Sequence, residues 1–181
     1  ATLTLSSDGV EDIIELPITL KVIDEEPATY VKVTNAVTDG EYLIVYEAGN
    51  VAFNGALTTL DAVSNTVAIE INNNIIVGNT EIDAATFTID ATAGTIKSAS
   101  GYYIGKTASG NGLNTDKTTA YTNTITIDAD KNAVVQSSGG SILRYNKAND
   151  QARFRYYGSG QQPIALYKKA SKHTVTIADC I

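Results

Sequence analysis

The residues best suited to contact a ligand are grouped toward the end of the chain. All three arginines lie there, at Arg144, Arg153 and Arg155. Tyr145 and Tyr157 are among the tyrosines beside them. Strand alternation places Arg153, Arg155 and Tyr157 on one face, where planar donors beside a flat ring suit a sugar with hydroxyl or acidic groups. We therefore predict that these five residues form the site if the chain binds a glycan or polysaccharide. The alternative is a structural strand pair whose arginines contact nearby acids.

Catalytic chemistry has few candidates in this sequence. The only histidine is His173 and the only cysteine is Cys180. Their separation of seven puts them on opposite faces of a strand, which does not suit a base and its nucleophile. No nucleophile elbow, phosphate loop or zinc motif is present. We predict that the chain is not an enzyme and has no catalytic residues and no cofactor.

One acidic stretch imitates the start of a calcium loop. Asp128, Asp130 and Asn132 occupy its first, third and fifth positions. The sixth position, however, is Ala133 where the loop needs glycine, and the twelfth is Gly139 where it needs an acid. We predict a plain turn and no metal site.

The charge balance excludes one class of partner. The chain carries 20 acidic and 13 basic residues, a formal net charge of −7, which disfavours attraction to phosphate backbones. We therefore expect no nucleic-acid partner. No apolar run approaches the roughly 20 residues of a membrane span, so we expect none in this segment. Abundant Thr, Asn, Ser and Gly favour short strands and polar turns, which predicts an all-β fold.

An internal repeat refines the fold prediction. The stretch that begins at Phe87 is echoed by the one that begins at Ile125, and their apolar positions match at an offset of 39. A weaker copy lies upstream, at offsets of 52 and 51. The matched core positions are Ile44, Ile96 and Val135, and Phe53, Ile104 and Leu143.

Each copy supplies about four strands and cannot cover its own apolar face, so the copies must share a core. Three unequal four-stranded repeats over Tyr30 to Lys169 predict a β-trefoil, a barrel of six strands capped by three hairpins. The alternative is a β-sandwich or another β-barrel.

The two ends of the chain differ from this middle part. Residues 1–27 carry two alternating segments, which predicts the closing hairpin of an immunoglobulin-like domain. Residues 28–169 form the trefoil-like domain. Residues 170–181 contain a further alternating run, HTVTI, which predicts the first strand of a following module.

The middle part resembles an uncharacterised module of large secreted and surface-anchored proteins of gut anaerobes. The likeness covers about Tyr30 to Lys169, and its most specific motifs are LRYN, RFRYY and PIALYKK. In such proteins the module stands beside immunoglobulin-like domains, and sometimes beside secreted nuclease or hydrolase domains. The resemblance implies an extracellular or cell-surface location and an accessory role, and it transfers no catalytic residues. Ricin-type sugar-binding trefoils carry a Q-x-W motif in each repeat, whereas this chain has no tryptophan.

These observations predict a non-catalytic accessory module of a secreted or cell-surface multidomain protein. Its role would be structural, as a spacer, or adhesive. The alternative is a carbohydrate-binding module attached to a secreted hydrolase or nuclease. We expect a monomer whose partners are the flanking domains of its own chain.

Overall fold

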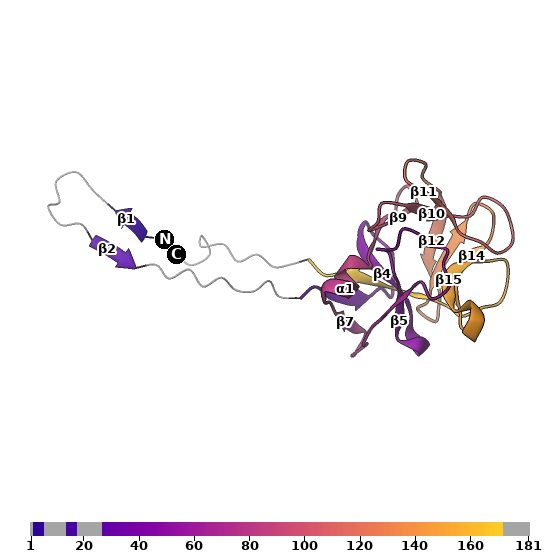
Figure 1. Cartoon of the computed structure of the whole chain (residues 1–181), viewed down its shortest axis with the longest axis horizontal. Helices are drawn as coiled ribbons and strands as arrows, with labels where there is room; N and C mark the ends of the chain where they lie inside the picture. The colour runs from indigo at the N-terminus through magenta and orange to yellow at the C-terminus, as the bar shows by residue number, and fades with distance from the viewer. Residues whose placement is uncertain (1, 6–13, 18–26, 172–181) are drawn as a thin grey trace.

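The computed structural model describes residues 2–5, 14–17 and 27–171 (Figure 1). These residues form mainly short antiparallel strands, which confirms the all-β prediction. The sequence analysis did not predict the short helix α1 (Thr80–Ala84). It begins after Asn79, whose side-chain oxygen accepts hydrogen bonds from the backbone N–H groups of Glu81 and Ile82. Two 3-10 turns, η1 (Glu47–Gly49) and η2 (Asn149–Gln151), complete the non-strand elements of these ranges.

The strands follow the alternating segments of the sequence. In chain order they are β1 (Thr2–Leu5), β2 (Ile14–Pro17), β3 (Thr29–Lys32), β4 (Gly40–Tyr46), β5 (Val51–Phe53), β6 (Thr66–Ala68), β7 (Ile75–Val77), β8 (Phe87–Asp90), β9 (Thr95–Ser98), β10 (Tyr103–Gly105), β11 (Asn114–Asp116), β12 (Asn123–Ile127), β13 (Ala133–Ser137), β14 (Ile142–Asn146), β15 (Arg153–Tyr157) and β16 (Ala165–Lys169).

Three antiparallel sheets contain these strands. β1 and β2 pair with each other, with Leu3 opposite Leu16. A ten-stranded sheet has the order β11-β10-β9-β8-β4-β16-β3-β7, and its remaining strands, β5 and β6, branch from β4. The third sheet has the order β12-β13-β14-β15. The assignment of β1 and β2 to an immunoglobulin-like domain stays a prediction, and residues 172–181 lie outside the described residues.

The sheets do not close into a barrel, which differs from the predicted ring of six strands. Within residues 27–171, the four-stranded sheet meets its surroundings through isolated bridges instead of continuous ladders. Ala133 bridges to Ile164, just before β16 begins, and Gly112 bridges to Tyr156. Side-chain packing must therefore supply most of the contact between the four-stranded sheet and the ten-stranded sheet.

The main core brings the matched positions of the three repeats together. Ile44, Ile96 and Val135 lie on β4, β9 and β13, and none of the three exposes any surface. The second matched set is equally buried and belongs to the same cluster of side chains: Phe53, Ile104 and Leu143. The offsets in the sequence therefore predicted correctly which apolar side chains converge.

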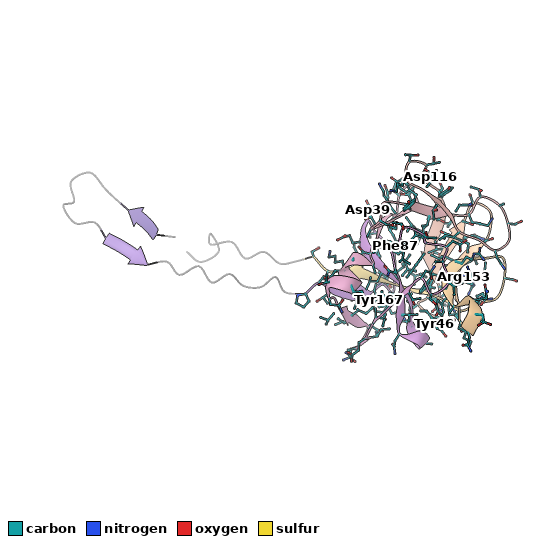
Figure 2. All side chains as sticks on the ribbon, viewed as in Figure 1. Asp39, Tyr46, Phe87, Asp116, Arg153 and Tyr167 are labelled. Carbon is teal, nitrogen blue, oxygen red and sulfur yellow. The ribbon has the colours of Figure 1, made fainter. Side chains whose placement is uncertain are left out.

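All three phenylalanines of the chain meet within this core. The ring centroid of Phe53 lies 4.8 Å from that of Phe87 and 5.3 Å from that of Phe154. All three side chains are fully buried, and Figure 2 shows Phe87 in the interior of the domain. Phe53 therefore links β8 to β15 through aromatic contacts that are favourable beyond their burial.

A buried asparagine connects the same core to three backbone segments. The Nδ2 group of Asn123 lies within hydrogen-bond distance of the carbonyl oxygens of Gly94, Ile104 and Tyr121, and its Oδ1 atom accepts a 2.7 Å bond from the Tyr156 hydroxyl. Gly94 has a φ of +67°, and a Cβ atom there would lie 2.1 Å from the Asn123 carbonyl oxygen. This close approach explains why glycine occupies the position.

The first and last strands of the domain are neighbours. β3 and β16 pair antiparallel with Tyr30 opposite Lys169, and the Ala170 N–H donates a 2.7 Å hydrogen bond to the Thr29 carbonyl. The two ends of the described range 27–171 therefore lie side by side. A second, smaller core lies under these strands and includes Tyr30 and Tyr167.

These two tyrosines make the free energy of unfolding depend on pH in the alkaline range. Burial raises the pKa of both phenols, and hydrogen bonds to carboxylates add to the shift, from Tyr30 to Asp83 at 2.8 Å and from Tyr167 to Glu47 at 2.6 Å. The folded state therefore holds these protons more tightly than the unfolded state, in which tyrosine titrates near pH 10. Their contribution is complete below pH 10 and is lost above it.

We expect the free energy of unfolding to fall above pH 10 by up to about 1.4 kcal/mol per pH unit for each such tyrosine. Urea unfolding between pH 8 and 11.5, with tyrosinate absorbance as a second signal, measures this slope. The double variant Tyr30→Phe with Tyr167→Phe should have a shallower slope. An equal slope in parent and variant would contradict the assignment.

Candidate ligand-binding site

The hairpin of β14 and β15 brings the three arginines onto one face. Arg144 lies directly opposite Arg155, and Asn146 lies opposite Arg153. Because opposite residues of an antiparallel pair point to the same side, all three guanidinium groups share the outer face of the hairpin. Figure 2 shows Arg153 beside this hairpin. We call Arg144, Arg153 and Arg155 the arginine face.

Of the two predicted tyrosines, Tyr145 does not belong to this face. It follows Arg144 on the same strand and so points to the opposite side, into the core. Its ring stacks on that of Tyr46 with centroids 4.6 Å apart, and only 8% of the residue is exposed. In this conformation its ring is therefore not open to a ligand on the arginine face, because neighbouring residues of a strand point to opposite sides.

Tyr157 does lie on the side of the arginine face, but it offers no open ring. Only 5% of its surface is exposed. Burial raises the pKa of its phenol, whereas the positive charges of Arg153 and Arg155 lower it. The Tyr157 ring is therefore buried beside the arginines. The stacking of a sugar on this ring, which the sequence analysis predicted, is not possible in this conformation.

Arg155 is held by a carboxylate that the sequence analysis did not connect with it. Its Nε atom lies 2.8 Å from Oδ1 of Asp61, and its Nη2 group donates a 2.9 Å hydrogen bond to Oδ2. The two residues are 94 positions apart. No local pattern in the sequence could have revealed the pair, because the loop between β5 and β6 carries Asp61.

A buried asparagine fixes that loop beside β15. The Nδ2 group of Asn65 donates a 2.9 Å hydrogen bond to the Phe154 carbonyl, and its Oδ1 atom accepts a 2.8 Å bond from the Phe154 N–H. Asn65 has no exposed surface. The backbone of Ser64 adds a 2.7 Å hydrogen bond to the Ala152 carbonyl. These hydrogen bonds hold the loop that carries Asp61 against β15.

The other two arginines have no carboxylate partner among residues 27–171. Arg153 donates through Nη2 to the side-chain oxygen of Gln151, while its buried Nε atom makes no hydrogen bond within the described part of the chain. Arg144 forms no ion pair in that part of the chain. Among residues 27–171, one of the three arginines of the arginine face is therefore paired with an acid, Asp61.

Two other places could bind a small molecule, and their polar groups are already engaged. An open pocket of about 540 Å³ is lined by Asp39, Gly40, Glu41, Lys168, Lys169, Ala170 and Ser171. There, Lys169 forms a 2.8 Å ion pair with Glu41 and Lys168 donates a 2.6 Å hydrogen bond to Thr38.

The second place lies near β10. Lys117 covers the ring of Tyr102 and Lys97 covers the ring of Tyr103, each with its Nζ atom 4.9 Å from the ring centroid.

The remaining candidates of the sequence analysis are His173, Cys180 and the acidic stretch at Asp128. His173 and Cys180 lie outside the described residues. The Asp128 carboxylate accepts a 2.8 Å hydrogen bond from the backbone of Asn132, so the acidic stretch is a turn between β12 and β13, as predicted. In residues 2–5, 14–17 and 27–171, no three His, Cys, Asp or Glu side chains are grouped to hold a metal ion. No helix in those ranges is long and apolar enough to cross a membrane.

Comparison of the chain with protein-family models, curated proteins and solved structures returned no match. The resemblance to modules of secreted and surface-anchored proteins therefore stays a prediction.

Proposed function

We propose that residues 28–169 are a β-trefoil-type, non-catalytic accessory module of a secreted or cell-surface multidomain protein. The observation that carries the structural role is the side-by-side position of its two ends on β3 and β16. When a polypeptide enters and leaves a domain at neighbouring points, the domain can be inserted between other domains without disturbing them. The resemblance to modules of secreted and surface-anchored proteins supports the extracellular setting.

Strand pairing supports the trefoil arrangement. In a ring of β4, β8, β9, β12, β13 and β16, four of the six neighbouring pairs are ladders: β4 with β8, β8 with β9, β12 with β13, and β16 with β4. The other two contacts are single links, from the Asn123 N–H to the Gly94 carbonyl and from Ala133 to Ile164. One hairpin per repeat remains outside this ring: β5 with β6, β10 with β11, and β14 with β15.

The use of polar side chains supports a structural role over a catalytic one. Asn65 and Asn123 are buried and bond to backbone groups, and the hydroxyls of Tyr30 and Tyr167 bond to carboxylates. Each of these groups thereby holds segments of the fold together.

The adjacent positions of β3 and β16 favour a module mounted at the side of the chain over a spacer that lengthens it.

The proposal predicts that residues 27–171 fold without their flanks. A two-stranded piece such as β1 with β2 cannot form a core of its own, so its removal should cost the module little. The melting temperature of residues 27–171 expressed alone should lie within about 3 °C of that of the whole chain, as measured by calorimetry. A fall of more than about 10 °C would show that the flanks are integral to the domain.

A second candidate function, carbohydrate binding, is favoured by one observation. The arginine face has more positive than negative charge in a chain whose formal net charge is −7. A structural strand pair would not require that excess.

A further inference from the structure

We propose that the arginine face binds the carboxylate group of an acidic polysaccharide, such as one built of uronic acid units. The inference goes beyond the proposed structural role, which needs no ligand. It rests on the placement of Arg144, Arg153 and Arg155 on one surface, where only Arg155 forms an ion pair within residues 27–171.

The first argument is the charge balance across the hairpin. Arg144 and Arg155 are directly opposed on neighbouring strands, an arrangement in which like charges destabilise the pair. Asp61 accepts a hydrogen bond from Arg155 Nη2 through Oδ2, and its Oδ1 atom lies 2.8 Å from Nε, so this carboxylate compensates one of the two charges. A bound carboxylate beside Arg144 and Arg153 would compensate the rest.

The second argument is preorganisation. Asp61 holds the Arg155 guanidinium through an ion pair and one hydrogen bond, and the side chain of Arg155 is only 27% exposed. Arg153 is anchored to Gln151, and its Nε donor is buried without a partner in the described part of the chain. Side chains that are already held in place lose little entropy on binding, and a planar fork of donors matches the two oxygens of a carboxylate.

The third argument concerns the spacing of charge on the ligand. Double-stranded DNA carries one negative charge per about 1.7 Å, so it would extend over the acidic remainder of this protein. A polysaccharide has carboxylates separated by neutral hydroxyl groups, which suits a small positive surface in acidic surroundings. Asn146 and Gln151 lie beside the arginines, and their side-chain NH2 groups can donate hydrogen bonds to those hydroxyls, whereas their oxygens already accept from Ala148 and Arg153.

The test uses the whole 181-residue chain and native affinity electrophoresis at about 50 mM salt. The gels contain polygalacturonate, which has a carboxylate on each unit, or neutral galactan. We expect polygalacturonate to retard the parent protein and galactan to leave its mobility unchanged. The double variant Arg144→Gln with Arg153→Gln should bind polygalacturonate at least tenfold more weakly, because it loses two sets of charge-assisted donors.

Two further variants separate a shaped site from general attraction. Lys117→Gln with Lys131→Gln lowers the net charge by the same amount at exposed positions elsewhere, and its affinity should change by less than about twofold. Arg144→Lys with Arg153→Lys keeps the charge but loses the planar fork, so its affinity should fall severalfold. All three double variants should melt within about 3 °C of the parent.

Several results would overturn the proposal: no retardation of the parent, equal retardation by galactan, an equal loss in the two glutamine variants, or full affinity in the lysine variant of the arginines. Stronger binding to single-stranded DNA or to polyglutamate than to polygalacturonate would assign the face to another class of ligand. Each of these results would leave the proposed structural role intact, because that role is tested by the folding of residues 27–171.

Discussion

Replacing Phe53 with alanine is expected to lower the free energy of unfolding by about 4 kcal/mol, the largest effect of any single truncation proposed here. Phe53 is fully buried between Phe87 and Phe154, with ring centroids 4.8 and 5.3 Å away. Truncation removes its buried apolar surface and leaves a cavity that rings from two other strands cannot fill without leaving their own contacts. Urea unfolding followed by fluorescence of the tyrosines measures the loss.

Two variants calibrate this prediction. Phe53→Leu keeps most of the volume and should cost about 1 to 2 kcal/mol. Val63→Ala truncates an apolar side chain that is 44% exposed, and it should change stability by less than about 0.5 kcal/mol. A loss below about 1.5 kcal/mol for Phe53→Ala would mean that the three rings are not packed as one unit.

The second large effect is expected at Asn123, whose replacement by alanine should cost about 3 kcal/mol. The change leaves the hydroxyl of Tyr156, a fully buried residue, without its 2.7 Å acceptor. It also removes the donor that serves the carbonyl oxygens of Gly94 and Ile104. Buried polar groups that lose a partner keep their desolvation cost, so the loss exceeds the value of one hydrogen bond.

A double-mutant cycle with Tyr156→Phe tests this explanation. Phenylalanine removes the hydroxyl that Asn123→Ala would strand, so the double variant should be more stable than the sum of the two single losses predicts. Asn149→Ala, at an exposed position in η2, is the matched control and should cost less than about 0.5 kcal/mol. Strict additivity in the cycle would show that the hydroxyl and the amide do not act together.

The sequence predicted the core of this domain better than its surface. Ile44, Ile96 and Val135 could be matched because each repeat must place an apolar side chain at the same point of a shared core. Such positions leave a periodic trace in the chain. The resulting prediction of their convergence is confirmed by their complete burial in one cluster.

The candidate site was only partly predictable. Alternation correctly grouped Arg153 with Arg155, since residues two apart share a face of a strand. The same rule would have excluded Tyr145, which directly follows Arg144. Asp61, in contrast, reaches Arg155 from a distant loop that Asn65 fixes through tertiary hydrogen bonds. Contacts of that kind follow from the packing of loops, which no local spacing encodes.

The pairing of β3 with β16 also determines how the domain responds to mechanical force. The two strands are antiparallel, and Thr29 and Ala170 meet at the same end of the pair. Tension applied through residues 27 and 171 would therefore open this ladder from that end, and its hydrogen bonds would be loaded one after another instead of all at once. A strand pair that opens from one end resists little force. Once unfolded, the fully extended chain between these residues would span about 500 Å. Under such tension the domain would thus yield early and release this length of chain.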